Sequence, residues 1–492
     1  MRLPISLVGM RPRPRCLVSI LESVDCPSTG HAHPNLVLAA RTTTTIQRAP
    51  LACGRPSLHV WTYGCLAAPS QWTAGSNCPK DELRSGVALP IAGHRYRRYV
   101  KSSSGATILE DREARHRYMH VLYVTSYYSP YVSGLSEHVR MVAEEMAKHH
   151  RVTVLTTAHA RDLQSEETLN GVRVVRARSL FQVSRAPVSP GFTRACSRLA
   201  RSVDVVHLHL PMADAALIAW ARGRAPMVVT YHCDASMPGP IGRLAEAALD
   251  ASCRAAIRAS TLAAATSLDY LHSSRMKSVG RCEIWREVPP PIKDLPGEGH
   301  PAMTAPGKTA IGFCGRLVAE KGLDVLIRAV AKLRLTRPDA ELHIAGQWAG
   351  VAGSHVYDSL IAMPEYDGSW VRFLGMIPDG SLVEFYRSLD VLALPSVNSF
   401  EAFGTVQVEA MLQGTPVVAS DLPGVRTVVR STGMGVLART GDAEDLAAKL
   451  DEVLSHRADY VKPAGSIRAM FGTTRTVELY REMYSQVTGL VA

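Results

Sequence analysis

Hydrophobic and polar positions along the chain change their pattern abruptly at Met119. Residues 1–118 are rich in Pro, Arg, Ser, Thr and Gly and show no sustained helical or strand period. After Met119, short apolar runs alternate with stretches whose apolar residues recur every three or four positions. Such alternation predicts right-handed βαβ units and a mainly parallel sheet that is covered on both faces. The strands expected on this basis are His120–Thr125, Val152–Thr156, Val203–Leu208, Met227–Tyr231, Thr261–Ala265, Thr309–Cys314, Glu341–Ala345, Val371–Leu374, Val391–Leu394 and Pro416–Ala419.

A proline-rich segment divides the alternating region into two similar halves. Three consecutive prolines follow Val288, and a Gly/Pro-rich stretch continues to Gly307. Proline lacks the N–H donor that a helix or a central strand needs, so this segment is expected to be a linker. In open α/β sheets the ligand binds beyond the carboxyl ends of the strands, so the site is expected in a cleft between two domains. The expected division is a Rossmann-like acceptor domain at 119–290, a linker at 291–307 and a Rossmann-like nucleotide-sugar domain at 308–492 that ends in the helix Thr473–Thr488.

The first 118 residues have two interpretations. Either they are an unstructured extension or an organelle-targeting arm, or Met119 is the natural start and the upstream segment is a mis-assigned start, which we favour. They carry 16 of the 55 Lys and Arg residues but only 7 of the 44 Asp and Glu residues, so the remaining part has 39 against 37. The folded part is therefore nearly neutral, and no basic stripe for a nucleic acid is indicated.

The cysteine spacing and the length of the apolar runs indicate the cellular compartment in which the protein is expected. None of the ten cysteines forms a CxxC pair, so neither a zinc site nor a disulfide framework is indicated, and a reducing compartment fits best. No apolar run reaches the length of a membrane span. We therefore expect a cytoplasmic protein. Three arginines at helical spacing, Arg194, Arg198 and Arg201, either form a solvated helix face or contact anionic lipid at the inner face of a membrane.

Two carboxylates, Glu401 and Glu409, stand eight positions apart after the strand Val391–Leu394. Glu401 falls in a loop, and Glu409 falls about two turns into a helix that begins near Thr405. Gly404 lets the N–H groups of this helix start approach a ligand, and the helix dipole favours a phosphate there. The loop thus offers a phosphate seat between two acceptors for sugar hydroxyls. The alternative is an ordinary helix start with acidic neighbours.

Two basic residues, Arg316 and Lys321, also lie between a strand and a helix. A departing nucleoside diphosphate gains negative charge as the glycosidic bond breaks, and a guanidinium and an ammonium group directed at it stabilise that change. Taken alone, such a pair is more often a solvated charged turn.

Together these motifs resemble a known family. Gly315-Arg316 with Lys321-Gly322, the run Leu342–Gly346, the run Val371–Gly375, Leu394-Pro395-Ser396, Glu401 to Ala410 and Gly414–Ala419 occur in the order found in the family-4 group of GT-B glycosyltransferases. That group includes bacterial phosphatidylinositol mannosyltransferases, and the resemblance covers roughly residues 119–490. It implies two Rossmann-like domains.

The resemblance implies a role for each matching residue. Arg316 and Lys321 match the diphosphate-binding pair, and Glu401 matches the carboxylate that contacts the donor sugar. Phe403, Gly404 and Thr405 match the loop that meets the sugar and the phosphate, and Glu409 matches the ribose-binding carboxylate.

The N-terminal half supplies two further candidates. The family usually has two adjacent glycines between the first strand and the first helix, where this sequence has Ser133-Gly134. Gly134 still permits a close approach to the donor. His232 follows the strand Met227–Tyr231 and matches the residue near the reacting sugar carbon. Its alternative role is a packed or hydrogen-bonded histidine.

The resemblance implies that the chain is a hexosyltransferase that retains the anomeric configuration and requires no metal. Its donor is a nucleoside-diphosphate sugar, bound as substrate and with no other cofactor. Its acceptor is a glycan, a lipid-linked molecule or a small molecule. Two alternatives stay open: a nucleotide-sugar epimerase of the same fold and a catalytically silent protein that binds a nucleotide sugar.

Overall fold

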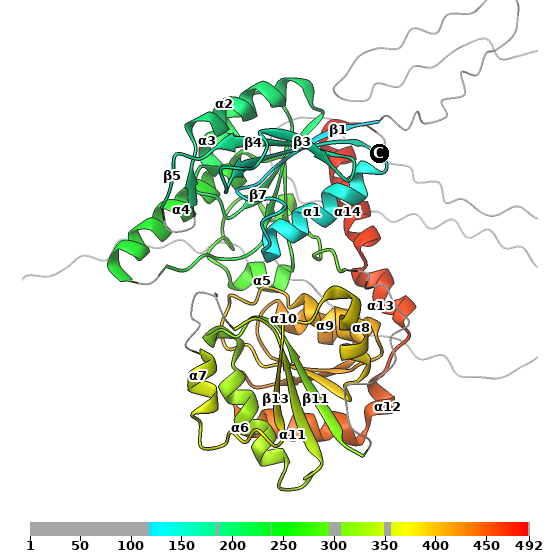
Figure 1. The fold of residues 1–492 in the computed structure, drawn as a ribbon. Helices are drawn as coiled ribbons and strands as arrows, with labels where there is room; N and C mark the ends of the chain where they lie inside the picture. Colours follow the sequence, from blue (N-terminus) through cyan, green and yellow to red (C-terminus); the bar gives the residue numbers. More distant parts are fainter. Residues whose placement is uncertain are drawn as a thin grey trace, which may run out of the picture. The chain divides into compact units, whose positions relative to one another are not determined.

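The computed structural model describes residues 118–490 apart from 184–185, 238, 294, 296–306 and 349–355. The expectations for residues 1–117 and for most of the linker at 291–307 lie outside these residues. Within the compact unit that holds the described residues, two large sheets each carry helices on both faces (Figure 1).

The first sheet has eight strands in the order β10-β9-β8-β7-β1-β2-β4-β3. All neighbours pair in parallel except β3 and β4, which form an antiparallel hairpin at one edge. Along β1 the side chains alternate between two cores, since Leu122 and Val124 join one apolar cluster and Val121 and Tyr123 join the other. The elements are β1 His120–Val124, α1 Gly134–Ala147, β2 Arg151–Ala158, β3 Glu166–Leu169, β4 Val172–Arg178, β5 Phe181–Val183, β6 Ala186–Val188, α2 Pro190–Leu199, β7 Val205–Leu210, α3 Ala215–Ala221, β8 Met227–Tyr231, α4 Gly239–Ala259, β9 Leu262–Ala265, α5 Leu268–Ser273 and β10 Trp285–Glu287.

The second sheet has six strands, all parallel, in the order β13-β12-β11-β14-β15-β16. Apolar clusters cover both of its faces. Its elements are β11 Thr309–Cys314, the short helix η3 Ala319–Lys321, α6 Leu323–Leu333, β12 Ala340–Ala345, α7 Val356–Ile361, β13 Val371–Gly375, α8 Asp379–Arg387, β14 Val391–Leu394, α9 Thr405–Leu412, β15 Val417–Ser420, α10 Val425–Thr432, β16 Gly435–Ala438, α11 Ala443–Ser455, α12 Arg457–Tyr460 and α13 Ala464–Phe471.

The last helix, α14 (Thr473–Thr488), was expected as the end of the second domain, but it packs into the core of the first sheet. Its Tyr480 and Tyr484 are fully buried there. The hydroxyl of Tyr484 lies 2.6 Å from Nδ1 of His207 in β7, and that of Tyr480 lies 3.0 Å from the hydroxyl of Thr230 in β8. A helix that contributes buried tyrosines to a core belongs to that core in energetic terms.

Further contacts tie the second half of the chain to the first. Thr473 donates a hydrogen bond to the carbonyl of Ile292 at 2.7 Å, at the start of the proline-rich connection. Arg426 of α10 forms two hydrogen bonds, of 2.7 and 2.8 Å, with the Asp269 carboxylate of α5. This ion pair therefore holds α10, which follows β15, against α5, which follows β9. None of the helices in the described part is both long and apolar enough to cross a membrane.

Candidate functional site

The predicted basic and acidic residues meet beside the carboxyl ends of β11 and β14. Lys321 ends η3, which follows β11, and Glu401 lies between β14 and α9. The ammonium group of Lys321 forms an ion pair with the Glu401 carboxylate, whose Oε2 also lies 3.4 Å from the hydroxyl of Ser396. The two side chains are 17% and 15% exposed, so this pair is mostly shielded but still reachable from solvent.

Arg316 lies on the same loop but is held far more loosely. Its side chain is 54% exposed, and its nearest carboxylate is that of Glu320 at 3.9 Å. An exposed ion pair at such a distance contributes little to stability. The guanidinium group can therefore move onto a bound anion at little expense in protein contacts.

Glu409 sits on α9 and is half-buried. It accepts a hydrogen bond of 2.7 Å from the hydroxyl of Tyr386 on α8. Burial raises the pKa of Glu409 above its usual range, and the hydrogen bond from Tyr386 opposes that rise in pKa. Burial also raises the pKa of the neighbouring Cys314 thiol to about 11, so this thiol stays protonated. The sequence singled out Glu409 but neither Tyr386 nor Cys314.

The loop before α9 depends on Gly404. This residue has φ = 76° and precedes the first residue of the helix, Thr405. The side chain of Phe403 is only 4% exposed and packs edge-on against Phe471, with ring centroids 5.7 Å apart. Phe403 thus anchors the loop in the core, and its contact with sugar and phosphate stays a prediction.

Before α1, the contacts of Ser133 explain how a serine can stand where the family usually has the first of two glycines. Its hydroxyl accepts a hydrogen bond from the N–H of Ser136 at 3.2 Å, and the hydroxyl of Ser136 accepts one from the N–H of Ser133 at 2.8 Å. This reciprocal capping box fixes the start of α1. Gly134 follows as the first helical residue, and a Cβ built there would have no neighbour within 4 Å. The space at Gly134 is thus open, and its contact with the donor stays a prediction.

His232 follows β8, as the sequence predicted, but it belongs to a cluster of histidines. Its Nε2 lies 3.0 Å from Nδ1 of His209 in β7, and its ring meets that of His138 in α1 edge-on at 4.5 Å. Burial lowers the pKa of His232 to about 3, so its imidazole is neutral at pH 7. Ring nitrogens of the three residues lie within 4.8 Å of one another, which makes them the group that could hold a transition metal among the described residues. In the structure Nε2 of His138 lies 3.2 Å from the hydroxyl of Tyr480, and Nδ1 of His209 lies 3.0 Å from Nε2 of His232, whereas Nδ1 of His138 and Nε2 of His209 are buried and have no hydrogen-bond partner.

Comparison with known proteins matches both halves of the chain. The model described as "Glycosyltransferase Family 4" covers residues 132–270, which include Gly134 and His232. The model described as "Glycosyl transferases group 1" covers residues 303–468, which include the Lys321–Glu401 pair. The chain belongs to the family-4 glycosyltransferases of the GT-B fold.

Two similar relatives act on inositol compounds by name. The chain is 32% identical over 313 residues to a D-inositol 3-phosphate glycosyltransferase of Nocardia farcinica. The match covers 57% of this chain and 66% of the relative, so the chain spans slightly less than two thirds of the relative's length. The chain is also 29% identical over 346 residues to a phosphatidyl-myo-inositol mannosyltransferase of Mycolicibacterium smegmatis, covering 67% of this chain and 84% of the relative.

Solved structures agree on the fold of this family-4 glycosyltransferase. The sucrose-phosphate synthase of Thermosynechococcus elongatus superposes with a TM-score of 0.61 at 18% identity, over 75% of this chain and 99% of that one. Anabaena HepE in complex with UDP and glucose does so with a TM-score of 0.56 at 20% identity, over 75% and 100% of the two chains. The expected GT-B fold is thereby confirmed. The two family models and the two inositol-named relatives favour a transferase over the silent binding protein and the epimerase.

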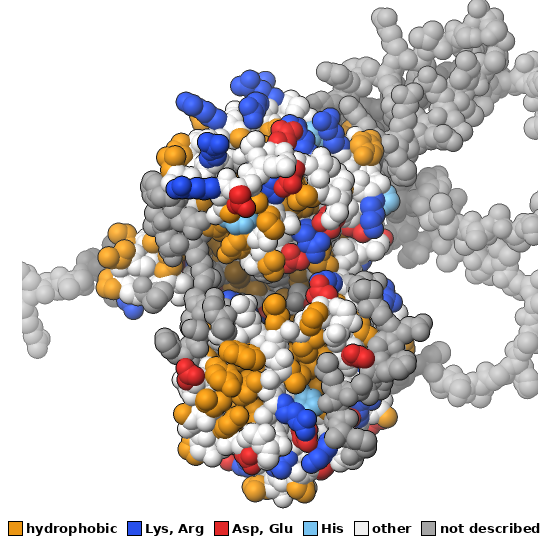
Figure 2. Space-filling view, viewed as in Figure 1, with side chains coloured by type: hydrophobic (Ala, Val, Ile, Leu, Met, Phe, Trp, Pro, Cys, Tyr) orange, Lys and Arg blue, Asp and Glu red, His pale blue; other side chains and the backbone are white. Residues whose placement is uncertain are grey.

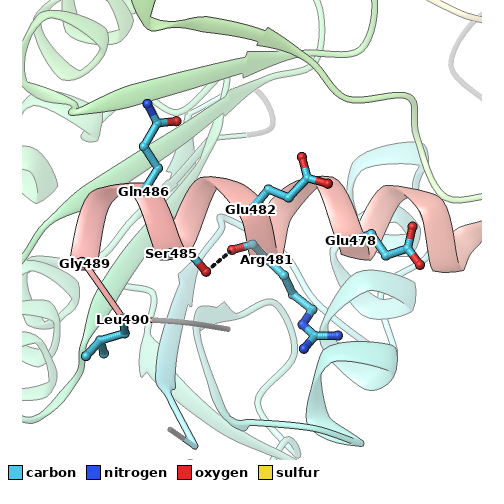
Figure 3. A pocket seen from close by; sticks show the side chains of 7 residues that line it. All are labelled: Glu478, Arg481, Glu482, Ser485, Gln486, Gly489 and Leu490. Carbon is cyan, nitrogen blue, oxygen red and sulfur yellow. Dashed lines mark hydrogen bonds between the residues drawn. The ribbon is translucent and has the colours of Figure 1, made fainter. Parts of the chain in front are cut away.

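One further hollow, of about 670 Å³, runs along the outside of α14. Figure 3 shows that its side chains point in different directions around the helix: Gln486 and Glu482 extend to one side, and Arg481 and Ser485 extend to the other. The hydroxyl of Ser485 donates a hydrogen bond of 3.0 Å to the carbonyl of Arg481 within the same helix. No common centre is formed, so this hollow is not a candidate site of the glycosyltransferase.

Proposed function

We propose that this chain transfers a hexosyl group from a nucleoside-diphosphate sugar to a glycan, a lipid-linked molecule or a small molecule. The observation that carries the proposal is the Lys321–Glu401 pair, with Arg316 beside it and the start of α9 next to it. The ammonium group of Lys321, the guanidinium group of Arg316 and the N-terminus of α9 supply positive charge around the Glu401 carboxylate. That combination suits a diphosphate next to a sugar.

The roles follow from where the charge changes during transfer. As the bond between the anomeric carbon and the diphosphate breaks, the leaving phosphate gains charge, which Lys321 and Arg316 offset. Glu401 then exchanges its partner, since Lys321 turns toward the phosphate and the carboxylate accepts from sugar hydroxyls. Glu409 accepts from the ribose hydroxyls, and its hydrogen bond from Tyr386 fixes its position.

We further propose that the reaction needs no metal and retains the anomeric configuration. Arg316, Lys321 and the N–H groups at the start of α9 carry the positive charge that Mg²⁺ provides in other transferases. His232, neutral at pH 7 because burial lowers its pKa, offers a hydrogen bond near the reacting carbon without adding a charge. No group besides the donor is proposed as a cofactor.

The acceptor and the location form the remaining part of the proposal. The names of the two relatives favour an acceptor with an inositol ring, either soluble or in a lipid headgroup. A peripheral contact with the inner face of a membrane is supported by α2, where Arg194 and Arg198 are exposed, and by α3, where Trp220 is 80% exposed. Figure 2 shows basic side chains gathered at the top of the view, over the region of α2.

The test is release of the nucleoside diphosphate from UDP-, GDP- and ADP-linked sugars in the presence of EDTA, with and without inositol acceptors. Glu401→Ala and Lys321→Ala should each lower turnover at least 100-fold while the circular dichroism spectrum stays unchanged. Lys332→Ala, which removes a half-exposed ion pair elsewhere on the second half, should leave turnover as it is. Turnover in Glu401→Ala equal to that of the wild type would refute the assigned roles, and NMR of the product's anomeric proton tests retention.

A further inference from the structure

A cavity of about 610 Å³ lies in the first half of the chain, apart from the residues discussed above. It is lined by the segments that follow β2 and β4, including His159 after the first and Ser179 after the second. Since β2 and β4 are parallel neighbours, both segments leave the sheet at its carboxyl edge. This is the edge at which open α/β sheets bind ligands.

Three residues that line this cavity each carry a buried polar atom that lacks a hydrogen-bond partner. These atoms are Nε of Arg176, Nδ1 of His159 and Oγ of Ser179. Leaving a buried polar group unpaired is unfavourable, and most such groups in folded proteins are satisfied. Their gathering in the lining of one cavity indicates that a polar ligand completes them.

The charges around the cavity define the ligand. Arg161, Arg176 and Arg178 line it, and no carboxylate does. The guanidinium group of Arg176 is fixed by an ion pair with Glu167 and by a hydrogen bond of 2.8 Å to the carbonyl of Ser129. Arg161 and Arg178 are exposed and form no ion pair with any residue that the structure describes. The two free guanidinium groups suit a phosphate group, whose oxygens accept from several donors at once, while the side chain of Arg176, which is fully shielded from solvent, holds the wall of the cavity in place.

The cavity is connected to the loop that leads into α1. The ring of His159 packs edge-on against Tyr131, with centroids 5.4 Å apart, and the carbonyl of Ser129 holds Arg176. Both loop residues lie just before Gly134, the predicted contact to the donor. A molecule anchored in the cavity therefore lies beside the segment that approaches the donor sugar.

We propose that this cavity holds a phosphate ester of the acceptor, with Arg161 and Arg178 as its mobile ligands and Arg176, His159 and Ser179 as its fixed floor. The claim that the bound phosphate belongs to the acceptor rests on the proposed glycosyl transfer. The claim that the cavity binds phosphate does not depend on that function. The ester comes either from a soluble sugar or cyclitol phosphate or from a phospholipid headgroup.

Phosphate binding is tested first, on the full chain and without turnover. Inorganic phosphate is titrated into the wild type, Arg161→Gln, Arg178→Gln and the double variant by calorimetry at low salt. A lost charge-assisted hydrogen bond should weaken binding by about tenfold for each single variant. Arg151→Gln is the matched control, because it removes the same charge at the opposite, amino end of β2. Equal affinity in the wild type and the double variant, or no binding to the wild type, would overturn the proposal.

Transfer is tested second, with myo-inositol, D-inositol 3-phosphate and vesicles that contain phosphatidylinositol as acceptors. Arg178→Gln should raise the KM of the phosphorylated acceptor about tenfold and leave its kcat and the acceptor-free release of nucleoside diphosphate unchanged. Preference for the soluble phosphate or for the vesicles identifies the source of the ester. An equal KM for myo-inositol and its phosphate would refute the acceptor role. Absence of any nucleoside diphosphate release would refute the transferase instead and leave the phosphate titration to decide this site.

Discussion

Replacing Gly404 with alanine tests whether the loop before α9 is built on a left-handed backbone. An L-residue at φ = 76° is strained by about 1–2 kcal/mol. The added Cβ would lie 2.5 Å from Cδ2 of Leu394 and 2.9 Å from Nε2 of Gln407, well inside contact distance. Overpacking of this kind costs about 1–3 kcal/mol. We therefore expect Gly404→Ala to lower the free energy of unfolding by about 2–5 kcal/mol.

The same substitution should weaken donor binding. The amide of Gln407 donates to the carbonyls of Phe403 at 3.0 Å and of Val425 at 3.2 Å, and these bonds hold the loop in place. Moving Gln407 away from a new Cβ strains both. Urea unfolding followed by tryptophan fluorescence, and calorimetry with the nucleoside diphosphate, measure the two effects.

The control is Gly465→Ala in α13, where φ is not left-handed and no atom lies within 4 Å of the added Cβ. It should be neutral or stabilise the protein by up to about 1 kcal/mol. A change of less than about 0.5 kcal/mol in Gly404→Ala, which is the range of ordinary surface substitutions, would refute the reasoning.

Three further predictions concern the two ends of the site. Gly134→Ala should leave the urea midpoint unchanged, because the position has room, yet weaken nucleoside diphosphate binding at least about tenfold in calorimetry; unchanged binding would remove Gly134 from the donor site. Tyr386→Phe removes the hydrogen bond to Glu409 and should raise the donor's KM about tenfold in steady-state kinetics, whereas an unaltered KM would make that bond purely structural. The folded-state pKa of Glu409 is raised above its unfolded value, so its contribution to stability is present at low pH and is lost as pH rises through the raised pKa. Glu409→Gln should therefore gain stability relative to the wild type as the pH rises from about 4, below the unfolded pKa of 4.5, to about 8 in urea unfolding. A difference that is the same at both pH values would contradict the burial of this carboxylate.

Strand positions were predictable where the apolar run is unbroken. The expected strands Met227–Tyr231, Thr309–Cys314 and Val391–Leu394 coincide with β8, β11 and β14, since buried parallel strands are continuous apolar runs. The hairpin of β3 and β4 was missed, although Asn170-Gly171 between them is a strong hairpin signal and both residues have positive φ. Arginines within β4 hid its apolar alternation.

Side-chain partners of the site were harder to predict than the site itself. Lys321 and Glu401 are 80 positions apart, and their motifs, not their spacing, suggested a shared site. Tyr386 and His209 carry no motif and reach Glu409 and His232 only through packing of neighbouring elements. Local patterns do not encode such tertiary pairs. Phe403 shows the reverse case, since its motif suggested a ligand contact while its ring packs in the core.

The place of α14 has a consequence for how the chain folds as it is made. The core of the first sheet includes Tyr480 and Tyr484, which leave the ribosome only after the whole second sheet. At roughly 5–20 residues per second, the strands up to β10 wait on the order of 10–40 s for the helix that covers them. During that time Tyr123, His207 and Thr230 lack the tyrosine hydroxyls that pair with them in the finished protein.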